Sequence, residues 1–171
     1  MKEAEAGLLD LQRLQPDVPE VLHLLALIGL QTGRAGAAAG HLEKAAAKLP
    51  GSADLQNLLG LALKELGRSE DAMAAYGRAI DINPGHAEAH VNLGAALHDL
   101  CRLEKARESF RRAIAAEPDF APAHENLGMT LLLDGKFEEG WAEYAWCSGR
   151  NVYLSGDRVL DKPFWDGSDL D

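Results

Sequence analysis

Two histidines, His86 and His90, are spaced four residues apart, the spacing at which side chains on a helix lie one turn apart. Imidazole nitrogens at this spacing can share a zinc ion, but a structural zinc site requires four converging ligands. His86 directly follows a proline–glycine turn and therefore precedes the start of a helix. A packing role is the simpler interpretation, so we expect no metal site here or at the weaker pair His98 and Cys101.

Residues suited to catalysis are also missing from the sequence pattern. The serines fall at expected turns, on helices or near the C-terminus, and none follows a strand in a G-x-S-x-G pattern. Gly33, Gly36 and Gly40 do not form a phosphate-binding loop, because no strand precedes them. We therefore expect no catalytic residues, no cofactor and no enzymatic activity in these 171 residues.

The composition points to packed helices and to a protein partner. Apolar residues make up 47% of the chain and aromatic residues only 6%, and β-branched residues are scarce. The net charge of −10 argues against binding to nucleic acid or to an anionic membrane, since both require basic surfaces. No apolar run is long enough to span a bilayer. Two isolated cysteines suit a reducing environment, so we expect a cytoplasmic protein.

The helices that position these residues follow from a repeat of 34 residues. The units 53–86 and 87–120 are identical at 13 of 34 positions. Four columns recur at this period: prolines at Pro16, Pro50, Pro84 and Pro118; large residues at Leu42, Tyr76, Phe110 and Tyr144; small residues at Gly60, Gly94 and Gly128; and turn residues at Gly33, Gly67, Cys101 and Gly135.

Each column has a physical reason. A turn glycine closes the first helix of a pair in a left-handed conformation, and the proline ends the second helix. Small residues should let the two helix backbones of a hairpin approach closely, while large residues fill the space between successive hairpins, which are stabilised by stacking. The expected helices are 2–15, 19–32, 35–49, 53–66, 69–82, 87–100, 103–116, 121–134 and 137–147.

The pattern His90-x-x-Leu93-Gly94-x-x-Leu97, followed by Ala106-x-x-x-Phe110 and Pro118, resembles the tetratricopeptide repeat. The resemblance implies an all-α, right-handed superhelix of antiparallel hairpins in which the first helix of each pair lines a concave groove. It divides the chain into a half repeat at 1–18, repeats at 19–52, 53–86 and 87–120, a degenerate repeat at 121–149, and an extended C-terminal segment at 150–171.

In this family the groove binds peptides, so we expect a protein-interaction scaffold that holds a peptide or protein segment. Asn92 and Asn126 resemble the asparagine ladder of O-GlcNAc transferase-type repeats, although a role in solvating the helix surface is an equal alternative. The inferred face carries six acids and one lysine, which predicts a preference for neutral or basic segments. The candidate site residues are Asn57, Leu61, Lys64, Glu88, Val91, Asn92, Ala95, His98, Asp99, Glu125, Asn126 and Met129.

The C-terminal part suggests a second function class. The run from Gly140 to Trp146, followed by the segment from Pro163 to Leu170, is similar to a junction in bacterial proteins that join tetratricopeptide repeats to a glycosyltransferase-like domain. The chain would then be the docking or oligomerisation region of a longer enzyme. We expect Ser148-Gly149 to end the last helix, residues 150–171 to pack near Trp141 and Tyr144, and self-association to use the half repeat or this segment.

Overall fold

The computed structural model describes residues 2–14 and 18–151. Within these ranges the chain forms nine α-helices and no strand. The bounds of the first eight helices agree with the sequence-based ranges to within one residue. The helices are α1 (Lys2–Leu14), α2 (Pro19–Gln31), α3 (Ala35–Lys48), α4 (Ala53–Glu65), α5 (Ser69–Ile82), α6 (Ala87–Asp99), α7 (Leu103–Ala116), α8 (Ala121–Leu133) and α9 (Phe137–Asn151).

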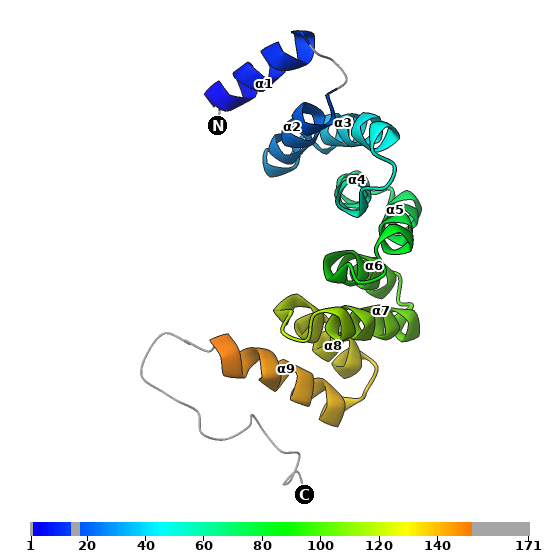
Figure 1. The fold of residues 1–171 in the computed structure, drawn as a ribbon. Coiled ribbons are helices and arrows are strands. Elements are labelled where there is room, and N and C mark those ends of the chain that lie inside the picture. The colour runs from blue at the N-terminus through cyan, green and yellow to red at the C-terminus, as the bar shows by residue number, and fades with distance from the viewer. Residues whose placement is uncertain (1, 15–17, 152–171) are drawn as a thin grey trace, which may run out of the picture.

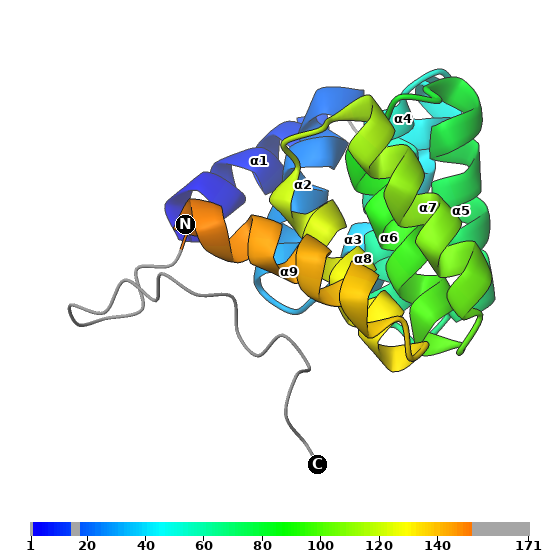
Figure 2. The same cartoon turned by 90° about the horizontal axis from the view of Figure 1, so that it is seen from below.

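The helices stack as antiparallel hairpins along an arc (Figure 1). Helices α2, α4, α6 and α8 lie on the inner side of the arc, and α3, α5 and α7 lie on the outer side. Seen from below, α1 and α9 project to the same side of the molecule, although Figure 1 places them at opposite ends of the stack (Figure 2). The all-α superhelix expected from the repeat is confirmed, with the first helix of each pair on the concave side.

The turn inside each hairpin is closed by a residue in the left-handed conformation. Gly33, Gly67 and Gly135 have φ angles of 70°, 74° and 75°, and Cys101 occupies the same position with a φ of 55°. The residue after each of them donates its N–H to the carbonyl five residues earlier, as from Arg68 to Leu63 at 2.9 Å. This bond satisfies a carbonyl that the end of the first helix leaves without a partner.

Small and large columns pack against each other, but at two of three glycines not in the way the sequence suggested. A Cβ atom on Gly60 would lie 2.4 Å from the Tyr76 ring, and one on Gly94 would lie 2.5 Å from the Phe110 ring. These glycines therefore make room for an aromatic ring rather than for a backbone. Only at Gly128 does the backbone of the partner helix approach, with the carbonyl of Gly140 at 3.1 Å from the added Cβ.

The last helix continues past the point at which we expected it to end. The backbone of α9 stays helical to Asn151, so the prediction that Ser148-Gly149 stops the helix at residue 147 is wrong. A glycine ends a helix when it adopts a positive φ, whereas a glycine with helical φ costs only about 1 kcal/mol relative to alanine. The expected packing of residues 152–171 lies outside the described residues.

Candidate peptide-binding face

The twelve candidate residues all lie on the three inner helices α4, α6 and α8. These helices contact one another directly along the inner side of the arc, in addition to their contacts within hairpins. Ten of the twelve side chains are exposed or half-buried, whereas Asn57 and Val91 are buried. The structure therefore brings the candidates onto one set of adjacent helices, although two of them are covered.

One hydrogen bond links two of the candidate asparagines across the inner face. Nδ2 of Asn92 on α6 donates to Oδ1 of Asn57 on α4 at 2.9 Å. The side chain of Asn57 is only 2% exposed, so Asn57 holds the Asn92 side chain in place from the interior of the protein. Asn126, at the repeat position equivalent to Asn92, instead donates to the carbonyl of Pro122 in its own helix at 2.7 Å. The two asparagines of the expected ladder thus have different environments.

Apolar side chains remain accessible beside these asparagines. Leu58 and Leu61 on α4 and Ala95 on α6 are half-buried, and Met129 on α8 is exposed. Leu24 on α2 extends this apolar surface towards the N-terminal end of the arc and is also exposed. We call the strip formed by these five residues the apolar floor. Because burying such side chains releases about 25 cal/mol per Å² of apolar surface, the strip favours contact with an apolar segment.

The charges around the apolar floor are mainly acidic. Lys64, the only lysine among the candidates, lies 3.1 Å from the carboxylate of Asp99 on the next inner helix. Glu88 and Glu125 are exposed, and within the described residues neither carboxylate forms an ion pair. The one candidate cation is therefore neutralised locally, which leaves a net negative face.

A hollow of about 610 Å³ opens next to Asn92, at the N-terminal ends of the inner helices. Val91, Phe120 and Pro122 give it apolar walls. Its charged lining is the three carboxylates of Asp54, Glu88 and Glu117. A hollow with apolar walls and an acidic rim suits a long side chain with an aliphatic stem and a cationic end.

Phe120 and Glu117 were not among the residues singled out from the sequence. They belong to the turn between α7 and α8, whereas the family's groove positions all lie within the first helix of each repeat. The sequence does contain a signal for Phe120. His86 occupies the equivalent position one repeat earlier, and both residues line the same hollow. Because Phe120 precedes the first residue of α8, the helical groove positions of the family do not include it.

The histidines considered as zinc ligands are occupied by other contacts. Nδ1 of His86 accepts the N–H of Ala89 at 3.3 Å and so caps α6, and its Nε2 lies 3.1 Å from the carboxylate of Asp54. His90 is buried, with Nε2 at 2.9 Å from the carbonyl of Pro84. Among the described residues no three His, Cys, Asp or Glu side chains come together as a metal site.

His124 occupies the same repeat position as His90 and makes the same contact, from Nε2 to the carbonyl of Pro118 at 2.9 Å. Its Nδ1 lies 2.6 Å from the carboxylate of Glu143 on α9, and its ring stacks on Trp146 at a centroid distance of 3.7 Å. The paired contact to a proline carbonyl shows that this histidine column ties the turn between repeats to the following inner helix. Both rings are structural.

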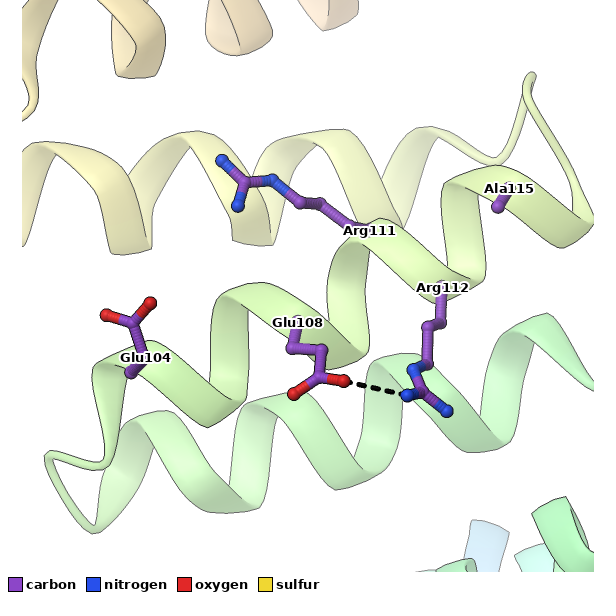
Figure 3. Close-up of a pocket in the computed structure, with 5 residues that line it drawn as sticks. All are labelled: Glu104, Glu108, Arg111, Arg112 and Ala115. Atoms are coloured by element: carbon purple, nitrogen blue, oxygen red, sulfur yellow. Dashed lines mark hydrogen bonds and ion pairs between the residues drawn. The ribbon is translucent and has the colours of Figure 1, made fainter.

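A second hollow, of about 370 Å³, lies along α7 on the outer side of the arc (Figure 3). The charges that line it are already paired. Arg112 lies 2.7 Å from Glu108 on the same helix, and Arg111 lies 3.3 Å from Glu139 on α9. Glu104 is paired with Arg107. Since each of these charges already has an ion-pair partner, the inner face is the better candidate for binding.

None of the described helices is both long enough and apolar enough to cross a membrane. No curated protein matches the sequence. Two family models do match: one described as "TPR repeat" covers residues 60–100, and one described as "Tetratricopeptide repeat" covers residues 87–120. These matches give no support to the glycosyltransferase-like junction expected from the C-terminal part.

Solved structures with the same fold include three tetratricopeptide or related proteins. MamA is 23% identical, with a TM-score of 0.78, over 86% of this chain and 86% of the other. TTC0263, a thermophilic TPR protein of Thermus thermophilus, is 24% identical, with a TM-score of 0.75, over 88% and 83%. YrrB, described as a TPR protein with an unusual peptide-binding site, is 21% identical, with a TM-score of 0.69, over 86% and 76%. At these identities the likeness concerns the fold. Residues 60–120 therefore match tetratricopeptide repeat models, and the described residues have the all-α superhelical fold of tetratricopeptide repeat proteins.

Proposed function

We propose that this chain is a protein-interaction scaffold that binds a peptide segment of a partner protein on the face formed by α4, α6 and α8. The hydrogen bond from Asn92 to the buried Asn57 carries this proposal. It fixes the orientation of an accessible carboxamide beside the apolar floor, so the group is ordered before a ligand arrives. Preorganisation of this kind lowers the entropic cost of binding.

The Asn92 side chain keeps the groups needed to bind a peptide backbone. One of its two N–H donors is used by Asn57, which leaves one donor and the carbonyl oxygen of the amide. A donor and an acceptor on one group match the carbonyl and N–H of an extended segment without reading its side chains. Leu61, Ala95 and Met129 would contact apolar side chains of that segment.

The acidic rim sets the charge of the partner. Glu88 lies at the hollow beside Asn92, and Glu125 follows on the next inner helix. An arginine or lysine of the bound segment would place its stem against Phe120 and Pro122 and its charge near the carboxylates. Complementary charge favours this partner over an acidic one, and the same negative surface disfavours nucleic acid and anionic membranes.

The comparison with YrrB supports a peptide as the class of ligand, because that protein of the same fold is described as having a peptide-binding site. We assign the chain no catalytic activity of its own, and the role of the chain is to hold a partner protein. We place this role in the cytoplasm, in keeping with the exposed free thiol of Cys101.

An array of 12-residue peptides of neutral, basic and acidic composition, probed with the full chain, would test the proposal. The tightest array member is then titrated by calorimetry against two variants. We expect Asn92→Ala to weaken binding about two- to tenfold, because a hydrogen bond contributes roughly 0.5–1.5 kcal/mol. Arg112→Ala, on the outer face, should leave the affinity unchanged. Equal affinity of Asn92→Ala and the original chain would refute the assignment of this face.

A further inference from the structure

Helix α9 carries an aromatic face that no described element covers. Phe137, Trp141 and Tyr144 are 62%, 40% and 42% exposed and follow one another at helical spacing. The rings of Trp141 and Tyr144 meet edge to face at a centroid distance of 6.0 Å. We call these three residues the α9 aromatic face. We propose that residues 152–171 of this same chain dock on it, in a contact separate from the peptide-binding face.

The equivalent position is covered in each earlier repeat. Tyr144 occupies the column of Leu42, Tyr76 and Phe110, each 34 residues apart. Those three side chains are 0% exposed, whereas Tyr144 is 42% exposed. Two features distinguish Tyr144. Helices α3, α5 and α7 are each followed by an inner helix that packs on them, and the described chain ends at α9. In addition, the rings of Tyr76 and Phe110 lie against Gly60 and Gly94 of their own hairpins, whereas the backbone of α9 approaches Gly128.

The other two positions show the same contrast. Trp141 lies in the column of Ala39, Met73 and Arg107, of which Ala39 and Arg107 are 5% and 3% exposed and Met73 is half-buried. Phe137 lies in the column of Ala35, which is buried, and of Ser69 and Leu103, which are half-buried. Each of the three α9 residues is thus more exposed than its counterparts in the earlier repeats. Exposed aromatic clusters of this kind mark binding surfaces, since aromatic rings contribute large areas to a contact.

The segment that follows α9 has the composition to cover this face. Between residues 152 and 171 it contains eight apolar or aromatic residues: Val152, Tyr153, Leu154, Val159, Leu160, Phe164, Trp165 and Leu170. Acidic linkers that remain free in solution are normally poor in such residues. The apolar residues therefore need a surface, and the α9 aromatic face is the accessible apolar surface next to them in the chain.

Chain length and tethering favour the intramolecular contact. Fourteen residues, from 152 to 165, can extend about 50 Å, roughly twice the ~22 Å length of α9. The segment can therefore turn back and run along the helix as far as Phe137. Covalent attachment also gives it an effective local concentration in the millimolar range, well above that of a second copy in dilute solution.

Two other arrangements fit the molecule less well. The α9 aromatic face lies where the first helix of a further repeat would pack, but the N-terminal helix α1 corresponds to the second helix of a repeat, so a head-to-tail stack would juxtapose the wrong elements. The inner face is acidic, and the segment 152–171 contributes five aspartates, so like charges disfavour that location.

Hydrogen exchange of the full chain, followed by mass spectrometry at two protein concentrations, tests the proposal. We expect amides between residues 152 and 171 to be protected at least about tenfold, equally at both concentrations, as local contacts of modest stability allow. The variant Trp141→Glu/Tyr144→Glu should abolish this protection. The matched variant Leu66→Glu/Leu100→Glu changes two leucines of similar exposure elsewhere and should retain it.

Peptides from α4 to α7 serve as a folding control within the same experiment. If the α9 variant disturbs them, Phe164→Ala/Trp165→Ala replaces it, because that change leaves α9 intact and should equally remove the protection. Unprotected amides in the original chain would overturn the proposal. So would protection that rises with concentration, which would assign the face to a second copy, or protection that survives both variants.

Discussion

The ring of Phe110 lies so close to Gly94 that a Cβ atom there would sit 2.5 Å from the ring. Phe110 is fully buried and cannot move aside. We therefore expect Gly94→Leu to destabilise the stack by more than the ~1–3 kcal/mol typical of overpacking, and Gly94→Ala by an amount within that range. Chemical denaturation measures both changes.

Gly77 provides the control for this substitution, because a Cβ atom there would meet nothing within 4 Å. Gly77→Ala lies within α5 and should stabilise the chain by about 0.5–1 kcal/mol through helix propensity alone. Equal unfolding midpoints for Gly94→Ala and the original chain would show that the ring contact is misplaced.

Tyr76 and Phe110 occupy equivalent positions, but only Tyr76 carries a hydroxyl, which is buried and has no hydrogen-bond partner among the described residues. Burial also raises the pKa of Tyr76, and the charge of Glu88 adds to the shift. We expect Tyr76→Phe to stabilise the fold by about 1 kcal/mol, since an unsatisfied buried hydroxyl costs roughly 1–3 kcal/mol. The reciprocal change Phe110→Tyr should be destabilising. A lower unfolding free energy for Tyr76→Phe would reveal a partner for the hydroxyl.

Cys101 holds the left-handed turn position that three glycines hold elsewhere, with a φ of 55°. A side chain in this conformation costs roughly 1–2 kcal/mol. Cys101→Gly should relieve part of this strain and raise the thermal midpoint, whereas Gly135→Ala should introduce the same strain and lower it. Midpoints that move in the same direction for both variants would contradict this account.

His41 makes stability depend on pH. Its burial, together with the charge of Lys44, lowers the pKa of His41 below its ordinary value of 6.5. The folded chain therefore takes up this proton less readily than the unfolded chain. The contribution to stability is present above pH 6.5 and is lost as pH falls through the lowered pKa.

Thermal unfolding at pH 8 and pH 5 measures the effect. The original chain should lose more stability on acidification than the variant His41→Gln, because neutral His41 can accept the amide hydrogen of Gln12 at 3.3 Å and protonated His41 cannot. The other histidines are present in both proteins, so their contributions cancel in the comparison. Identical pH dependence in both would exclude His41 as the source.

Glu88 tests the charge preference of the inner face. Glu88→Gln removes one carboxylate from the hollow and should weaken binding of a basic peptide about two- to fivefold, with the loss diminishing at high salt. Glu108→Gln, on the outer side of α7, is the control and should have no effect. Tighter binding of an acidic peptide than of its basic counterpart by the original chain would reverse the proposed preference.

The fold could be predicted from the amino-acid sequence, because the repeat consists of local and periodic signals. Turn residues such as Gly67, helix-ending prolines and apolar columns specify each hairpin within its own 34 residues, and hairpins of the same shape must then stack to bury the faces they leave open. The helix bounds followed to within a residue, apart from the end of α9. There the glycine signal failed, because glycine stops a helix only when a left-handed turn is required.

The tertiary structure alone decided how the site is assembled. Asn57 lies one residue before the position that is equivalent to Asn92 in the preceding repeat, so the periodic pattern does not pair them. The offset between stacked inner helices nevertheless brings their side-chain amides to 2.9 Å. The same offset joins Lys64 to Asp99 and places Phe120 at the hollow. Such contacts depend on the distance and rotation between neighbouring hairpins. These are set by the packed side chains of both, such as Met73 of one hairpin and Leu93 of the next, which pack against the same core clusters, and not by the sequence of either hairpin alone.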